Sequence, residues 1–155
     1  MAIHIHAIGS NMPSWVCQAS NDYAKRLNAP WDTHTHEIPA LKRTKNANLD
    51  TILKLESESL WQSLPKQAFS ITLDRQGKVL SSTQFSQLID NKLSIGIPIS
   101  FLIGGPEGLS PEYINKADHT LSLSAMTFPH PMVRVILIEQ IYRAWSIKHR
   151  HPYHR

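Results

Sequence analysis

Hydrophobic and polar positions follow two different periods along this chain, and the period switches several times. Short stretches alternate between apolar and polar residues or are apolar throughout, which is typical of β-strands. Such strands are predicted at residues 2–8, 33–38, 68–73, 97–103 and 119–124. The stretch at residues 97–103 is almost continuously apolar, which indicates a strand covered on both faces.

Longer stretches between these strands carry apolar residues at helical spacing. They predict helices at residues 15–27, 48–64 and 82–93, a short helix after Ser110, and a last helix at residues 131–151. Ser14, Ser82 and Ser110 are suitable N-caps, and Pro131 fits the first turn of the last helix. Strands that alternate with helices predict a single α/β domain over residues 1–155, with a mostly parallel sheet and helices on both faces.

The last predicted helix is more apolar than a surface helix needs to be. Only Arg134, Glu139 and Arg143 interrupt its apolar residues between positions 132 and 145. A helix that is apolar nearly all round is buried on several sides, so this one is expected to thread into the core or to pair with a second copy. Charges on such a helix are usually paired or functional.

Ligands of parallel α/β sheets bind at the carboxyl ends of the strands. This rule selects the loops after Leu73, Ile103 and Ser124, the first of which is predicted to be a turn at residues 74–77. The second loop, GGPEG at residues 104–108, matches neither the dinucleotide nor the P-loop fingerprint. Its glycines either allow a ligand to approach the backbone or merely form a turn. In the third loop, the apolar side chains and the main chain suit an adenine ring, although spacing alone favours simple core packing.

Composition limits the class of protein but does not indicate a particular function. The chain is 41% hydrophobic and 18% charged, which indicates a folded domain. It contains no apolar run long enough for a membrane helix and no signal peptide pattern. The lone Cys17 excludes an internal disulfide and fits a cytoplasmic location. A formal net charge of +4 is compatible with a nucleic-acid partner but does not establish one.

Histidines and basic residues supply the remaining candidates. The pairs His4 with His6 and His34 with His36 each place two imidazoles on one face of a strand. No cysteine or acidic cluster accompanies them at zinc-ligand spacing, so the sequence predicts no metal site and favours histidines at a strand edge or facing solvent. The basic loop at residues 42–45 and the tail at residues 148–155 either contact phosphates or form a solvated surface.

Three longer segments make a family resemblance recognisable. They are FLIGGPEGLS at residues 101–110, LSLSAMTFPHPMVRVILIEQIYRAWSI at residues 121–147 and HPYHR at residues 151–155. Together they resemble the RlmH family, which are SPOUT-class methyltransferases of large-subunit ribosomal RNA. The resemblance runs the full length of the chain. One departure is Thr44, where some relatives carry glycine in the loop expected to contact RNA.

The resemblance implies a fold, a cofactor and a substrate. The fold is expected to contain a deep C-terminal trefoil knot, an exception to the rule against threaded chains. The enzyme is expected to be a homodimer in which one subunit's S-adenosylmethionine pocket meets the other subunit's tail. The implied substrate is N3 of a pseudouridine in the decoding-centre helix of 23S rRNA in assembled ribosomes. The implied cofactor contacts are Leu73, Gly104, Gly105, Leu123, Ser124, Ala125, Met126, Thr127 and Phe128.

Methylation at N3 requires removal of a weakly acidic proton and stabilisation of charge on the neighbouring carbonyl oxygens. His154 is the candidate base, and Arg143 or Arg155 is the candidate donor to a uracil oxygen. Tyr153 is expected to stack on the base. Glu139 most simply pairs with Arg143 at i and i+4, and otherwise orients it or accepts a proton.

Arg43, Lys45 and Arg155 are the expected RNA contacts. Two other functions fit the same sequence: an RNA- or ribosome-binding module without turnover, and a SPOUT methyltransferase that acts on tRNA.

Overall fold

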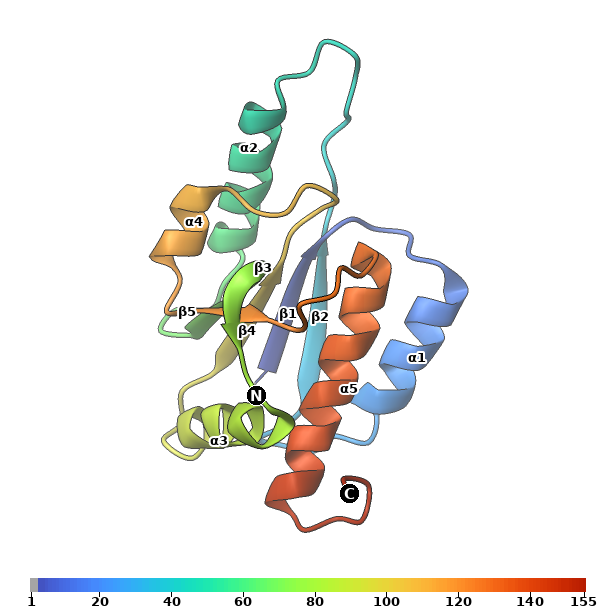
Figure 1. The fold of residues 1–155 in the computed structure, drawn as a ribbon, viewed down its shortest axis with the longest axis vertical. Helices are drawn as coiled ribbons and strands as arrows, with labels where there is room; N and C mark the ends of the chain where they lie inside the picture. Colours follow the sequence, from blue (N-terminus) through green and yellow to red (C-terminus); the bar gives the residue numbers. More distant parts are fainter. Residues whose placement is uncertain (1–2) are drawn as a thin grey trace.

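The computed structural model describes residues 3–155, so position 2 of the first predicted strand lies outside the described residues. Strands and helices alternate along the whole chain (Figure 1). In order, the elements are β1 (Ile3–Ile8), α1 (Ser14–Ala24), β2 (Thr33–Ile38), α2 (Leu49–Gln62), β3 (Phe69–Val79), α3 (Ser82–Leu93), β4 (Ile99–Ile103), α4 (Pro111–Lys116), β5 (His119–Ser122) and α5 (His130–Lys148).

The strands form one five-stranded sheet with the order β2-β1-β4-β3-β5. Every neighbouring pair is parallel, which confirms the predicted α/β class. The strand predicted to be covered on both faces, β4, lies at the centre of the sheet and is buried at every position.

The two faces of the sheet differ in chemistry. Alternate residues such as Ile3, Ile71 and Phe101 join the main core beneath α1, α3 and α5. The other face carries polar side chains, among them His6, Thr72 and Ser100, and only a small apolar cluster against α2 and α4. Helices thus cover both faces of the sheet, as expected for parallel strands.

Two predicted helix caps are wrong by one position. Pro13 rather than Ser14 precedes α1, and its side chain makes no capping bond. Ser81 rather than Ser82 caps α3, where it forms a capping box with Gln84. Ser82 instead donates a hydrogen bond to Gln140 of α5 at 2.8 Å. Ser110 precedes α4 as predicted, with Pro111 in the first turn.

The predicted turn at residues 74–77 lies inside β3 and does not end it. The pairing of β3 with β5 shifts register between Leu73 and Lys78, both of which lie opposite Leu121. Asp74 stabilises the irregular segment by accepting a hydrogen bond from the backbone of Gln76 at 2.9 Å. A Cβ on Gly77 would lie 2.7 Å from the backbone of Leu121, so the glycine marks a close approach of two strands rather than a chain reversal.

The last helix packs against both α1 and α3 (Figure 1). It ends at Lys148, three residues before the predicted end, because Arg150 takes a positive φ of 52° and the chain turns back. Its charged residues are paired, as predicted. Among the described residues, no helix is both long enough and apolar enough to cross a membrane. The trefoil knot stays a prediction.

Candidate functional site

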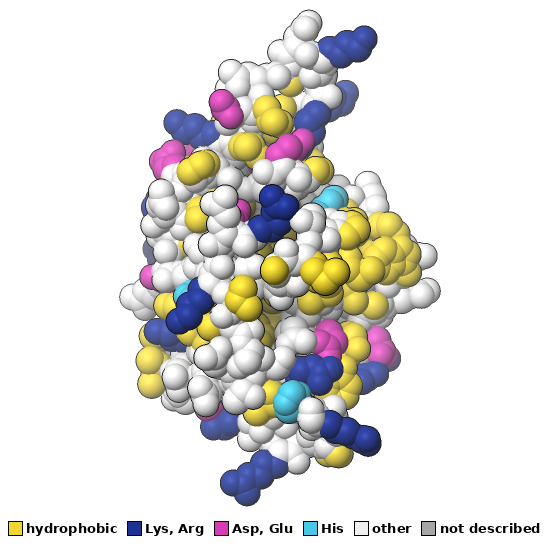
Figure 2. All heavy atoms as spheres, in the orientation of Figure 1, with side chains coloured by type: hydrophobic (Ala, Val, Ile, Leu, Met, Phe, Trp, Pro, Cys, Tyr) yellow, Lys and Arg dark blue, Asp and Glu magenta, His cyan; other side chains and the backbone are white. Residues whose placement is uncertain are grey.

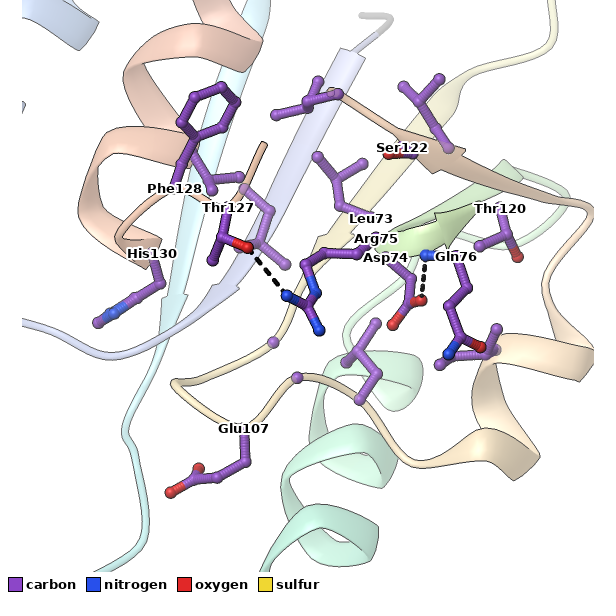
Figure 3. Close-up of a pocket in the computed structure, with 18 of the residues that line it drawn as sticks. Leu73, Asp74, Arg75, Gln76, Glu107, Thr120, Ser122, Thr127, Phe128 and His130 are labelled. Atoms are coloured by element: carbon purple, nitrogen blue, oxygen red, sulfur yellow. Dashed lines mark hydrogen bonds between the residues drawn. The ribbon is translucent and has the colours of Figure 1, made fainter. Parts of the chain in front are cut away.

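A cavity of about 1010 Å³ lies at the carboxyl ends of β4 and β5, beside the irregular segment of β3 (Figure 3). Its walls come mainly from residues 73–76, 103–109 and 120–131. These are the three segments selected from the sequence, although the first of them lies within β3 and is not a loop at its carboxyl end. Of the nine cofactor contacts implied by the resemblance, eight line this cavity and Ala125 does not.

The glycine loop after β4 needs its glycines for its own shape as well as for the cavity. A Cβ on Gly104 would collide with the backbone of Gly108. Gly108 has a φ of 86°, and its N–H donates to the Gly105 carbonyl at 3.0 Å. The tight turn is therefore confirmed, and it forms one wall of the cavity; the approach of a ligand to its backbone stays a prediction.

Arg43 lies behind this loop and is bound to two carboxylates. Its guanidinium donates to Glu56 and, at 2.9 Å, to Glu107 of the glycine loop. These hydrogen bonds raise the pKa of Arg43 above its usual value, and the bond from Arg43 lowers the pKa of Glu107. In this conformation Arg43 fixes the loop. Its expected contact with RNA stays a prediction, as do those of Lys45 and Arg155, which are exposed.

The four candidate catalytic residues meet at the other end of α5. Glu139 accepts hydrogen bonds from Arg143 at 2.6 Å and from the Tyr153 hydroxyl at 3.0 Å. Arg143 lies 4.9 Å from the centre of the Tyr153 ring and contacts Nδ1 of His154 at 3.3 Å. The sequence placed these residues on one helix and one tail, and the structure brings them into one hydrogen-bonded group.

Two details of this group bear on the expected roles. Burial and hydrogen bonds to Tyr23 and Glu139 raise the pKa of Tyr153, so its hydroxyl stays protonated. The ring also packs edge-on against Tyr142, with centroids 4.7 Å apart. Because Arg143 is always a donor, Nδ1 of His154 must be the acceptor, and the neutral ring carries its proton on Nε2.

The cavity lies at one end of α5, and the group of Glu139, Arg143, Tyr153 and His154 (the Arg143 group) lies toward the other end. His130 lines the cavity, and the helix runs about 20 Å from there to Arg143 at 1.5 Å per residue. None of Glu139, Arg143, Tyr153 and His154 lines the cavity. Within one chain, therefore, the expected cofactor contacts and the expected catalytic residues do not form a single site.

Sequence reasoning missed several side chains of the cavity. Arg75 reaches across it and donates to the Thr127 hydroxyl at 2.9 Å (Figure 3). Asp74 and Gln76 belong to the same wall, and all three fell within the segment predicted to be a turn. His130 also lines the cavity, and its burial, with Arg134 and Arg43 nearby, lowers its pKa. No motif in the sequence pointed to Arg75, whose role depends on the register shift in β3.

Comparisons with known proteins identify the family of the chain. A family model described as predicted SPOUT methyltransferase matches residues 1–154. The chain belongs to the SPOUT methyltransferase family. Among its relatives, a protein of Thioalkalivibrio sulfidiphilus named ribosomal RNA large subunit methyltransferase H is 45% identical, over 100% of this chain and 99% of its own length. A protein of the same name from Coxiella burnetii is 44% identical over the full length of both chains.

Solved structures resemble this SPOUT methyltransferase in fold at much lower identity. A structure described as a probable methyltransferase from Bordetella pertussis Tohama I aligns with a TM-score of 0.60 at 10% identity, covering 92% of this chain and 93% of that chain. A methylase family protein from Neisseria gonorrhoeae gives a TM-score of 0.59 at 13% identity, covering 90% and 81%. At these identities the likeness concerns the fold alone.

Proposed function

We propose that this SPOUT methyltransferase transfers the methyl group of S-adenosylmethionine to N3 of a pseudouridine in 23S rRNA of assembled ribosomes. The observation that carries the proposal is the cavity at the carboxyl ends of β4 and β5 and beside the irregular segment of β3, lined by eight of the nine expected cofactor contacts. The full-length relatives named for methylation of large-subunit ribosomal RNA support the substrate class. A ribosomal substrate places the reaction in the cytoplasm.

The cavity suits S-adenosylmethionine in size and in chemistry. Its volume of about 1010 Å³ is that of a pocket for a ligand of this size. Leu73, Leu123 and Phe128 supply apolar surface for an adenine ring, and the main chain of residues 121–128 supplies donors and acceptors. Asp74 offers a carboxylate to a cationic ligand, whereas the Glu107 carboxylate is paired with Arg43. When bound, the cofactor supplies an electrophilic methyl group on its sulfonium.

The acceptor nitrogen must be deprotonated and aligned with that methyl group. Arg143 is suited to hold a uracil carbonyl oxygen, since Glu139 fixes its guanidinium by two hydrogen bonds to one oxygen. His154 serves as the base once its Nδ1 exchanges Arg143 for the N3–H of the substrate. Glu139 accepts hydrogen bonds at both of its oxygens, so we assign it the positioning of Arg143 rather than proton transfer.

A homodimer resolves the separation of the two groups within one chain. In a twofold dimer, the Arg143 end of one α5 can lie at the cavity of the partner subunit. Large exposed hydrophobic residues at the start of α1 and α5, Trp15 and Met132, are suited to such an interface. Figure 2 shows hydrophobic side chains gathered over this part of the surface. An exposed patch of this kind marks an interaction surface.

Methyl transfer from labelled S-adenosylmethionine tests the reaction and the substrate together. The substrates are assembled ribosomes, isolated large subunits, bulk tRNA, and ribosomes whose target pseudouridine is replaced by uridine. We expect label in 23S rRNA of assembled ribosomes alone, and loss of label with uridine. Label in tRNA would move the protein to another branch of the family. Cofactor binding without label anywhere would favour the RNA-binding module.

Mixing of two inactive variants tests the composite site. Gly104→Val fills the glycine loop of the cavity, and His154→Ala removes the base. If the site combines two subunits, re-equilibrated equal mixtures contain one intact site in half of the dimers, so activity returns to about a quarter of the wild-type value. A mixture that stays inactive would contradict the composite site. His149→Ala is the matched control, because His149 is an exposed histidine near the same tail and is expected to keep full activity.

A further inference from the structure

The two histidine pairs of the sequence meet on one face of the sheet. Strands β1 and β2 are parallel and in register, with His4 opposite His34 and His6 opposite His36. One ring nitrogen each of His4, His6 and His36 lies within 4.8 Å of the other two. His4 and His6 are buried rather than solvent-facing, which corrects the expectation from the sequence, and His36 is exposed.

We propose that His4, His6 and His36 bind a divalent transition-metal ion of the zinc class, with solvent as the fourth ligand. Imidazole is a favoured ligand of zinc, copper and nickel, and three histidines with one open position are an established zinc arrangement. Bonds of about 2.0–2.1 Å in a tetrahedron place ligand nitrogens roughly 3.3–3.4 Å apart. The nitrogens of His4 and His36, 3.0 Å apart, are already near this spacing, and that of His6, within 4.8 Å of the other two, must move closer to them.

The hydrogen bonds around His6 place its lone pair on Nε2. The Ser63 hydroxyl donates its one proton to the Leu60 carbonyl at 2.6 Å, so it must accept from Nδ1 of His6, 2.8 Å away. Nδ1 then carries the proton, and Nε2 has the lone pair. A second ring nitrogen held by a hydrogen-bond acceptor is the usual support of a metal-binding histidine. Among the described residues, the hydrogen-bond partner of Nε2 is the Ser100 hydroxyl at 3.3 Å, which donates to this lone pair and would have to turn away when an ion binds.

The contact between His4 and His36 is also explained by a shared ligand. Nδ1 of His4 lies 3.0 Å from Nε2 of His36, a distance at which one nitrogen must carry a proton if no ion is present. A metal ion would replace that proton and use both lone pairs. The other nitrogen of His4, Nε2, is buried without a partner among the described residues. An ion at Nδ1 would leave the proton on Nε2, so the shared ligand explains the contact of Nδ1 and not the environment of Nε2.

The alternative is a stack of neutral imidazoles without an ion. The rings of His6 and His36 are stacked, with centroids 4.8 Å apart and an interplanar angle of 17°. Stacking explains this ring pair, whereas the 3.0 Å contact of His4 with His36 then requires a proton between the two nitrogens. His34 does not complete the set, because its Nε2 binds Asp32 at 2.9 Å.

Such an ion would join the edge strand β2 to β1. None of its three ligands lines the cavity at the carboxyl ends of the strands, so the site is separate from the proposed methylation site. We therefore expect metal to raise stability and to leave methyl transfer largely unchanged.

Metal binding is tested on the untagged full chain, because an affinity tag of histidines would compete for the ion. Zinc is titrated by calorimetry, and cobalt is added separately to record the visible absorption of a tetrahedral site. The decisive variant is His36→Asn, whose side chain is exposed, so folding is preserved. The matched control is His34→Asn, an exposed histidine on the same strand that is held by Asp32.

We expect one zinc ion per wild-type chain and a tetrahedral cobalt spectrum. Zinc at 100 times its Kd should raise Tm by about 5–10 °C. His36→Asn should weaken binding by more than about 100-fold, since even outer-shell changes cost about 10–100-fold. His34→Asn should keep wild-type binding. Equal zinc affinity in wild type and His36→Asn, or equal losses in both variants, would overturn the proposal.

Discussion

The two arginines of α5 occupy opposite ends of one helix and have opposite surroundings. Arg134 is 5% exposed and donates to the carbonyls of Ile8 and Gly9 at 3.0 and 2.7 Å, and to Glu37 at 2.8 Å. Arg143 is 27% exposed, and among the described residues its guanidinium has hydrogen bonds and a ring contact with side chains, those of Glu139, Tyr153 and His154. The first is tied to the ends of strands, and the second belongs to a group that faces outward.

This difference distinguishes an arginine that fixes the fold from an arginine that can contact a substrate. Main-chain carbonyls at strand ends cannot move without moving the sheet, so Arg134 fixes the start of α5 and the cavity wall beside it. Side chains on the tail can exchange partners, so Arg143 and His154 can turn to a substrate. A basic residue of the same type therefore serves structure at one end of the helix and, as we propose, chemistry at the other.

The largest effect is expected from Arg143→Ala. Loss of a donor to a charge that develops in the transition state typically lowers turnover by about 10²–10³-fold. Single-turnover methylation of ribosomes measures this loss, and the thermal unfolding midpoint should hardly change, because the side chain is partly exposed. Arg143→Lys is the companion variant and should restore only part of the rate, since it lacks the planar fork. Unchanged turnover in Arg143→Ala would remove the arginine from the reaction.

The complementary change at the other end is Arg134→Ala. Loss of hydrogen bonds from a charged group to buried carbonyls should lower the free energy of unfolding by about 2–3 kcal/mol. Urea unfolding measures it, and turnover per folded molecule should stay within a few-fold of wild type. A variant of full stability but without turnover would reverse the roles that we assign to the two ends.

A smaller effect is expected in the cavity from Gly104→Ala. Because its Cβ meets the backbone of Gly108, the loop must open, and S-adenosylmethionine affinity should fall about tenfold, or about 1.4 kcal/mol. Calorimetry measures the affinity directly. Gly96→Ala is the control: its φ of 77° strains alanine, but no atom lies within 4 Å of the added carbon. It should cost stability and leave affinity unchanged.

The smallest effect is expected from Lys45→Ala in the exposed loop. Loss of one phosphate contact should reduce the salt dependence of ribosome binding by about one unit of slope and weaken binding a few-fold. Ribosome pelleting at several salt concentrations measures both. Identical slopes in wild type and variant would place the loop outside the RNA interface and leave Arg143 and the tail as the contacts to RNA.

The sequence predicted the elements well because hydrophobic period and burial agree along most of this chain. The continuously apolar β4 lies at the sheet centre, and the loops after β4 and β5 form much of the cavity. The family resemblance gave nine expected cofactor contacts, and eight of them line the cavity. Short-range pattern and motif therefore sufficed wherever the determining contacts are local.

Long-range register was not predictable in the same way. The segment at residues 74–77 has turn residues, yet it continues as a strand because β5 pairs with both sides of it. The meeting of His6 with His36 depends on the relative register of β1 and β2, which spacing within each strand does not give. The same holds for Arg43, whose carboxylate partners Glu56 and Glu107 are distant in sequence.

The hydrogen bonds from Arg134 to the carbonyls of Ile8 and Gly9 have a consequence for synthesis of the chain. The first strand is made early but lies between β2 and β4, and its end is held by β2 and by the last helix. At about 5–20 residues per second, its second partner β4 appears on the order of 5–20 s later. The nascent protein must keep one edge of this strand unpaired during that time. We therefore expect a truncated chain that lacks α5 to need a chaperone rather than to fold as a smaller domain.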